Sequence, residues 1–137
     1  MPESGGTLRI VLAVAARSDI HEALMWSQER FGERAAARYR ELLKQALRDI
    51  ASDPERSGSK ERLDLARGVR SYHLFLSRDR ARGDLGVVEK PRHFLVYRRR
   101  GNAGIDVVRV LHDASDLERH LPEECLRNPD LSDPDET

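Results

Sequence analysis

Two short apolar runs in the C-terminal half of the chain predict a β-hairpin. Residues 94–97 (FLVY) and 105–111 (IDVVRVL) are rich in β-branched and aromatic side chains, which favour strands. Residues 101–104 (GNAG), between the runs, tolerate the positive φ that a tight turn requires. Strict alternation along the second strand places Ile105, Val107, Arg109 and Leu111 on one face and Val108, Val110 and His112 on the other. Apolar residues on both faces predict that this strand lies inside a sheet.

The N-terminal half has the spacing of one strand and two helices. Residues 8–14 (LRIVLAV) form a compact apolar run that predicts a buried strand. Residues 17–31 and 33–51 then repeat apolar positions every three or four residues, as amphipathic helices do. The first stripe comprises Ile20, Ala23, Leu24, Ser27 and Phe31, and the second comprises Tyr39, Leu43, Ala46, Leu47 and Ile50. Gly32 predicts a left-handed cap between the helices, and Asp53-Pro54 ends the second helix.

The middle of the chain is less regular. Residues 55–68 form a polar connector with a short turn near Leu63 and Leu65, and residues 69–76 (VRSYHLFL) predict a strand. Residues 77–91 (SRDRARGDLGVVEKP) are a charged insertion ahead of the hairpin. This insertion is long for a hairpin loop, and loops of this length are usually functional or mobile.

The end of the chain differs in composition from the rest. Ser115 and Glu118 match a capping box, which predicts a short helix ending at Leu121. Residues 122–137 contain three prolines and many acids, and they have too little apolar content to fold alone. The predicted organisation is therefore a single domain over residues 1–121 followed by an acidic, disordered tail.

The predicted order of elements is strand, helix, helix, strand, strand, strand and short helix. The short connection at Gly32 forces the two helices into an antiparallel hairpin. Their joint apolar face needs a sheet to cover it. The predicted fold class is therefore α+β, with the helical hairpin packed on a small, mainly antiparallel sheet.

Composition and charge narrow the classes of function. No apolar run is long enough to cross a bilayer and no signal peptide is evident, so a cytoplasmic location is expected. The single cysteine allows no internal disulfide and suggests no metal site, and no glycine loop suggests a nucleotide cofactor. The last 16 residues hold six acids and one base, so residues 1–121 hold 23 bases and 18 acids, a net charge of +5. That charge suits nucleic acid or an acidic protein segment, and a solvated surface also accounts for it.

His112 is the histidine with the most suggestive position. It ends the second strand of the hairpin beside Asp113, where it serves either as a general base or as a hydrogen-bonding partner at the strand end. Trp26 lies off the apolar stripe of its helix, so it either widens the buried face or meets a partner. Cys125 lies in the polar tail with no histidine placed to activate it, which favours an inert thiol.

Arginines are concentrated on the same hairpin. Arg98 and Arg100 project from one face of their strand and Arg99 from the other, with Arg92 and Arg109 nearby. Such a set binds phosphates or carboxylates through bidentate guanidinium contacts. A strand end that simply rises into solvent is the alternative interpretation.

Five segments carry a family pattern: ARSDIHEAL, AARYRELLKQALRDIASDPE, VRSYHL, RHFLVYR and VVRVLHDASDLERHL. Together they resemble the ParE toxins, which belong to the RelE/ParE superfamily of type II toxin–antitoxin systems. The resemblance covers residues 8–121, and its most specific part is the ending RVLHDxxDLxxHL at residues 109–121. It implies the fold predicted above and a plasmid-stabilisation type of toxin that a ParD-like or similar antitoxin holds inactive.

The superfamily implies two activities. RelE-like members cut mRNA in the ribosome with basic residues and a tyrosine, whereas ParE-like members are associated with DNA gyrase poisoning and carry no recognised nuclease residues. Residues 112–116 (HDASD) are acidic where a RelE-like nuclease is basic, and residues 117–121 offer no tyrosine. Lys60 and Lys90 are expected in loops rather than on the middle strands. This departure favours the ParE branch, a binding protein rather than an enzyme, with DNA gyrase as its target.

The candidate chemistry and the resemblance together assign the site residues. The residues expected to bind the target or the antitoxin are Arg92, Tyr97, Arg98, Arg100, Arg109, His112 and Asp113, with no catalytic residue, metal or cofactor. One alternative is a RelE-like ribosome-dependent mRNA endonuclease that uses Arg92, Arg98 and His112 and contacts RNA directly. In the preferred interpretation nucleic acid is contacted only through the antitoxin complex. The other alternative is a degenerate toxin that is retained as an antitoxin-binding partner.

Overall fold

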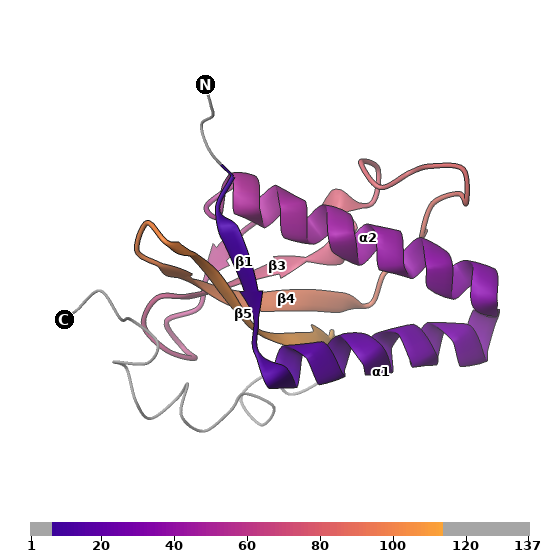
Figure 1. The fold of residues 1–137 in the computed structure, drawn as a ribbon, viewed down its shortest axis with the longest axis horizontal. Helices are drawn as coiled ribbons and strands as arrows, with labels where there is room; N and C mark the ends of the chain where they lie inside the picture. The colour runs from indigo at the N-terminus through magenta and orange to yellow at the C-terminus, as the bar shows by residue number, and fades with distance from the viewer. Residues whose placement is uncertain (1–6, 114–137) are drawn as a thin grey trace.

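The computed structural model describes residues 7–113, which form two helices and a five-stranded sheet (Figure 1). The elements in chain order are β1 (Arg9–Leu12), α1 (Val14–Phe31), α2 (Glu33–Ser52), β2 (Lys60–Glu61), β3 (Val69–His73), the 3₁₀ helix η2 (Leu74–Ser77), β4 (His93–Arg100) and β5 (Gly104–His112). The predicted helix ending at Leu121 and the predicted acidic tail lie outside the described residues.

The sheet has the strand order β1-β5-β4-β3-β2. β5 runs parallel to β1 and antiparallel to β4, and the remaining pairs are also antiparallel. β5 therefore lies inside the sheet, as its two apolar faces predicted. The parallel β1–β5 pair is connected through the helical hairpin and the other three strands, which is the long connection that a parallel pair requires. The α+β fold class, with a helical hairpin on a mainly antiparallel sheet, is confirmed.

Gly32 joins the two helices into the predicted antiparallel hairpin, which covers one face of the sheet (Figure 1). Its φ is +96°, and no atom lies within 4 Å of where a Cβ would be, so backbone conformation rather than space favours glycine here. Its N–H donates to the Gln28 carbonyl at 2.8 Å. The positive φ was predicted, but the ψ of 175° is extended and not that of a left-handed helical residue.

The helix-covered face of the sheet holds the larger core. α2 buries Tyr39, Leu43, Ala46 and Ile50 as its stripe predicts. α1 buries mainly small side chains, and the prediction that Phe31 belongs to its buried stripe is wrong, because Phe31 is 66% exposed. Phe31 is the last residue of α1, and Figure 1 shows that the helical hairpin extends past the end of the sheet on this side.

A β-bulge changes which side chains of β5 face the helices. Val96 pairs with Arg109 but Tyr97 pairs with Val107, so Val108 has no partner on β4. The strict alternation predicted for β5 is therefore wrong beyond Val107, because the extra residue shifts the pattern by one position. Ile105, Val107 and Val110 pack in the helix-side core, while Val108 and Leu111 pack in a smaller core on the opposite face.

Two strand predictions differ from the structure, and one strand was missed. β1 is an edge strand rather than a buried one, and Val11 is 44% exposed. The strand predicted at residues 69–76 ends at His73, because residues 74–77 turn into η2. β2 (Lys60–Glu61) was not predicted, because two residues are too few for any periodicity to be read from the sequence. The expectation that Lys60 lies in a loop is therefore wrong, since Lys60 is on this edge strand.

Candidate functional site

Four rings from four elements meet at the end of the β4–β5 pair that is remote from its connecting turn, here termed the hairpin base. His93 and His112 are cross-strand partners, and their ring centroids are 5.2 Å apart. Trp26 of α1 lies 5.4 Å from the first ring and 5.6 Å from the second. Tyr39 of α2 lies 5.5 Å from His93. All these contacts have the edge-to-face geometry that aromatic pairs prefer.

The Tyr39 hydroxyl organises the buried side of this cluster. It accepts a hydrogen bond from the Arg92 backbone N–H at 2.9 Å and lies 2.7 Å from His93 Nδ1. Burial, aided by the nearby His112, lowers the pKa of His93 to about 4. The neutral imidazole therefore accepts a hydrogen bond from the Tyr39 hydroxyl at Nδ1. Burial disfavours the charged form of Tyr39 as well, which raises the pKa of that hydroxyl.

Asp113 organises the exposed side of the hairpin base. Its carboxylate lies 3.1 Å from Arg92 Nε, 3.2 Å from His73 Nε2 and 3.7 Å from His112 Nδ1. Burial acts to raise the pKa of Asp113, but the hydrogen bonds from His73 and Arg92 outweigh it and hold the pKa below its ordinary value. His73 Nδ1 accepts from the Phe75 N–H at 3.0 Å, so its Nε2 carries the proton toward Asp113.

At the turn end of the same strand pair, here termed the hairpin tip, arginines meet a buried acid. Arg98 Nη2 lies 3.4 Å from Asp106 Oδ2, and Arg100 Nη2 lies 2.8 Å from the same oxygen. The prediction that Arg98 and Arg100 project together is confirmed. The Arg98 side chain is only 12% exposed, whereas that of Arg100 is 51% exposed. Arg99, on the other face, donates to the Gly101 carbonyl at 2.7 Å.

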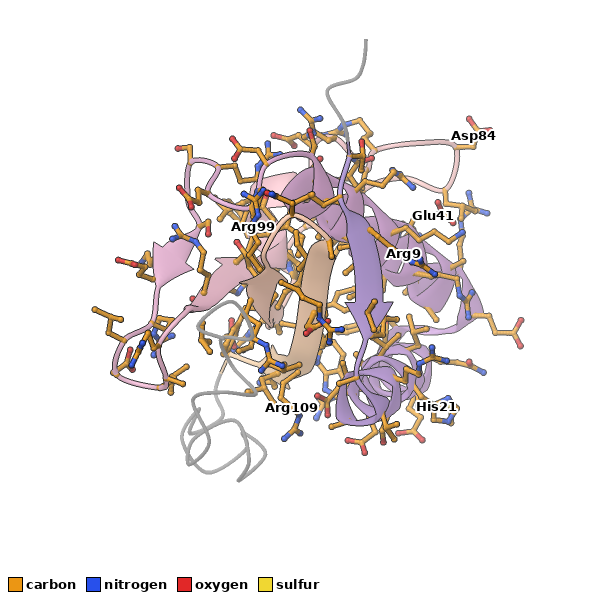
Figure 2. All side chains as sticks on the ribbon, turned by 60° about the vertical axis from the view of Figure 1, so that its left-hand side comes forward. Arg9, His21, Glu41, Asp84, Arg99 and Arg109 are labelled. Atoms are coloured by element: carbon orange, nitrogen blue, oxygen red, sulfur yellow. The ribbon has the colours of Figure 1, made fainter. Side chains whose placement is uncertain are left out.

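Arg109 is held inside the fold by α1. Its Nε and Nη2 donate to Asp19 at 2.6 and 2.9 Å, and the Val110 N–H donates to the same carboxylate at 2.9 Å. β1 pairs with β5 only as far as Val107. Beyond the end of β1, the Asp19 carboxylate therefore takes the place of a strand partner and accepts the hydrogen bond from the Val110 N–H. Figure 2 shows Arg109 near the start of α1, while His21 of the same helix points outward.

Tyr97 belongs to the core rather than to a surface. It is 0% exposed, and its hydroxyl donates to the Pro54 carbonyl at 2.6 Å and lies 2.5 Å from Ser59 Oγ. Burial raises its pKa. The structure thus brings Arg92, His112 and Asp113 together at the hairpin base. It leaves Arg100 at the tip and ties the side chains of Tyr97, Arg98 and Arg109 into the fold.

A cavity of about 620 Å³ lies next to the hairpin base. The overhanging end of the helical hairpin forms one wall, with Trp26, Phe31 and Tyr39. Residues 87–92 form the other, and cations line the rim from both sides. The sequence singled out Trp26 and the insertion separately, but nothing in either pattern indicated that they share a cavity.

Residues 7–113 meet neither the requirements of a metal site nor those of a membrane-spanning helix. Across this part of the chain, no three histidine, cysteine or acidic side chains gather as a metal site requires. Neither of the helices described has the length and apolar character needed to cross a membrane.

The fold defines a class of protein: it is a helical hairpin on a small mixed sheet, as in toxins of the RelE/ParE type. A profile of the family described as "ParE toxin of type II toxin-antitoxin system, parDE" matches residues 10–117. The chain belongs to the ParE toxin family. Membership assigns it a role in a type II toxin–antitoxin system and implies a cognate antitoxin as its partner. A comparison with curated proteins gave no match.

Proposed function

We propose that this protein is a ParE-type toxin that inhibits DNA gyrase, and thereby replication, and that binding of its cognate antitoxin neutralises it. The family match over residues 10–117 is the observation that carries the proposal. In this proposal residues 1–121 are the toxin domain, residues 122–137 are a separate acidic tail, and the protein acts by binding rather than as an enzyme.

The positions of the arginines argue against the endonuclease alternative. Arg92 and His112 meet at the hairpin base, but Arg98 lies six residues further along β4. At about 3.3 Å per residue this is roughly 20 Å of strand, too far for the three side chains to act on one phosphodiester. Arg98 also faces Asp106, which compensates its charge. These distances favour a binding toxin.

We assign the binding surface to the residues that the fold leaves accessible at the hairpin base. Arg92 has a side chain that is 49% exposed, and His112 and Asp113 are each about one-third exposed beside it. Such a surface suits an antitoxin segment that lies as a helix in a groove or adds a strand to the sheet. Arg100 at the tip extends the surface, while Tyr97, Arg98 and Arg109 support it from within the fold.

Controlled expression tests the proposal. Induction should arrest growth, trigger the DNA damage response and leave transcripts intact, and co-expression of the antitoxin encoded next to the toxin gene should restore growth. Codon-specific mRNA cleavage that disappears in a folded His112→Ala variant would establish the endonuclease instead. Antitoxin binding without any growth arrest would identify a degenerate toxin.

A further inference from the structure

The insertion at residues 77–91 is fixed to the helical hairpin. Ser77 Oγ donates to Asp49 Oδ2 at 2.5 Å, and Arg80 Nε donates to Asp49 Oδ1 at 3.1 Å. Asp49 is itself only 2% exposed. Further along, Arg38 of α2 donates to the Leu85 carbonyl at 3.3 Å. The insertion is therefore attached to α2 both near its C-terminal end, at Asp49, and in its N-terminal part, at Arg38.

A second set of contacts shapes the part of the insertion that faces the cavity. Arg78 Nη1 donates to the Glu89 carbonyl at 2.6 Å, which links the two ends of the insertion. Val88 packs against the main core, and Pro91 is buried. Residues 87–90 therefore form a defined wall opposite Trp26 rather than a free loop.

The two walls differ in chemistry from an ordinary solvated groove. Five apolar side chains line the cavity: Trp26, Phe31, Ala35, Val87 and Val88. Four cations also line it, Arg30, Arg38, Lys90 and Arg92, against a single lining acid, Glu89. Arg92 is in addition paired with Asp113, which is not part of the lining. Arg30 lies over the Trp26 ring at 5.6 Å and Arg38 bonds a carbonyl, so neither contact compensates the positive charge.

We propose that this cavity binds an apolar side chain flanked by carboxylates on an acidic, amphipathic segment of the antitoxin. The inference rests on the proposed function and names the chemistry of its partner. The volume lies within the range of sites that enclose a ligand group, and tryptophan and arginine are the side chains that most often dominate binding interfaces. The carboxylates complement the cationic rim, and the apolar walls require an anchor that a nucleic-acid backbone lacks.

In this arrangement the insertion determines which antitoxin the toxin accepts. Val87, Val88, Glu89 and Lys90 supply most of one wall. Their side chains therefore select the size of the anchor and the charge of the residues beside it. A toxin with the same helical hairpin but a different insertion would present a different cavity. The insertion thereby acts as a specificity element for pairing within one fold.

Trp26 is the only tryptophan in the chain and reports occupancy of the cavity directly. The probe is the antitoxin encoded next to the toxin gene, with any tryptophan of its own changed to phenylalanine. Binding should lower the acrylamide quenching constant of Trp26 by about twofold or more, because a buried anchor at an interface excludes solvent.

Two substitutions at the cavity have matched controls elsewhere. Lys90→Glu and Phe31→Ala should each weaken antitoxin binding by about tenfold or more, as loss of an interface anchor does. Lys44→Glu and Leu63→Ala change side chains that are 54% and 68% exposed away from the cavity, and they should stay within about twofold of wild type. Circular dichroism establishes that all four variants are folded.

The outcomes separate this inference from the proposed function. Unchanged antitoxin affinity in Lys90→Glu and Phe31→Ala would overturn the cavity as the site and leave the toxin proposal intact. Failure of the neighbouring antitoxin to bind or to restore growth would overturn both. Protection of Trp26 by duplex DNA as strong as that by the antitoxin would identify a nucleic-acid site.

The acidic tail of the chain itself is the other possible occupant. A full-length neutral-tail variant tests it, with amides in place of Glu123, Glu124, Asp130, Asp133, Asp135 and Glu136. If Trp26 of the free protein is more strongly quenched in the neutral-tail variant, the tail fills the cavity and the inference is wrong. Equal quenching in the two free proteins supports an antitoxin segment as the occupant.

Discussion

The two ends of the β4–β5 pair carry similar residues in very different states. At the hairpin tip, Asp106 is buried on the neighbouring strand and compensates Arg98, whose side chain is 12% exposed. At the hairpin base, Asp113 directly follows the end of β5 and contacts Arg92 and two histidines. Arg92 remains 49% exposed there.

This contrast shows that the register of the acids, rather than the number of arginines, decides which arginines are available to a partner. An acid that is the direct cross-strand partner of an arginine keeps that side chain buried, because a buried carboxylate requires a close counter-charge. An acid beyond the end of a strand leaves its arginine at the surface. Each of the following predictions changes a residue at the hairpin tip, at the hairpin base or in the tail, and the expected effects decrease from the first to the last.

The largest effect is expected at the tip. Asp106→Asn leaves Arg98 nearly buried without a counter-charge, and removing one partner of a buried pair typically costs about 3–5 kcal/mol of unfolding free energy. Urea denaturation measures the loss. The double variant Arg98→Met/Asp106→Leu should regain most of it, because an apolar pair needs no compensation. A similar loss in the double variant would show that packing, not charge, dominates the tip.

Much of the tip and of the fold around it follows from local sequence signals. The α2 stripe ending at Asp53-Pro54, the glycine between the helices and the shared face of Arg98 and Arg100 all depend on neighbours within a few positions. The β-bulge does not, because residues 107–110 (VVRV) offer apolar side chains in either register. Without a periodic signal, only the packing of the sheet decides which valine is the extra residue.

The candidate site depends on contacts between distant parts of the chain, which no local pattern encodes. Asp19 and Arg109 are separated by 90 positions, and Tyr39 and His93 by 54. The sequence singled out His112 with Asp113, and Trp26 with a possible partner, as separate features. Their meeting at the hairpin base follows from the position of α1 over β5, which requires the whole fold.

The second effect is a pH dependence that arises at the base. The pKa of His93 is about 4 in the folded protein and 6.5 in an ordinary histidine. Above pH 6.5 the imidazole is neutral in both states. Between pH 6.5 and about 4 only the unfolded chain binds the proton. The free energy of unfolding therefore decreases by up to about 3 kcal/mol as the pH is lowered through this range.

Urea denaturation from pH 7.5 to pH 4.5 measures this slope. A His93→Asn variant should be less stable at neutral pH but should lose much less stability on acidification, since the depressed group is gone. An unchanged slope in His93→Asn would assign the pH dependence to other groups.

A smaller loss is expected from Tyr39→Phe. The change removes the hydroxyl that accepts from the Arg92 N–H and donates to His93 Nδ1. An unsatisfied buried polar group costs about 1–3 kcal/mol. The variant should also raise the pKa of His93, because the bond to its neutral form is lost, and NMR titration of the imidazole measures that rise. If Tyr39→Phe weakens stability with no change in this titration, the hydroxyl acts through Arg92 alone.

The smallest effect concerns the charge at the tip and uses the neutral-tail variant. The tail holds six acids, and attachment to the same chain gives them a local concentration of about 1 mM near basic groups. Asp106 pairs with both Arg98 and Arg100, and Arg98 is nearly buried, so Arg99 and the half-exposed Arg100 are the tip arginines that DNA can reach. Neutralising the tail should therefore raise non-specific duplex binding only about two- to threefold at low salt. With two phosphate contacts, the slope of log affinity against log salt should reach at most about −2. An Arg99→Ala/Arg100→Ala background should abolish the gain, and equal DNA binding with and without the tail charges would show that the tail does not shield the tip.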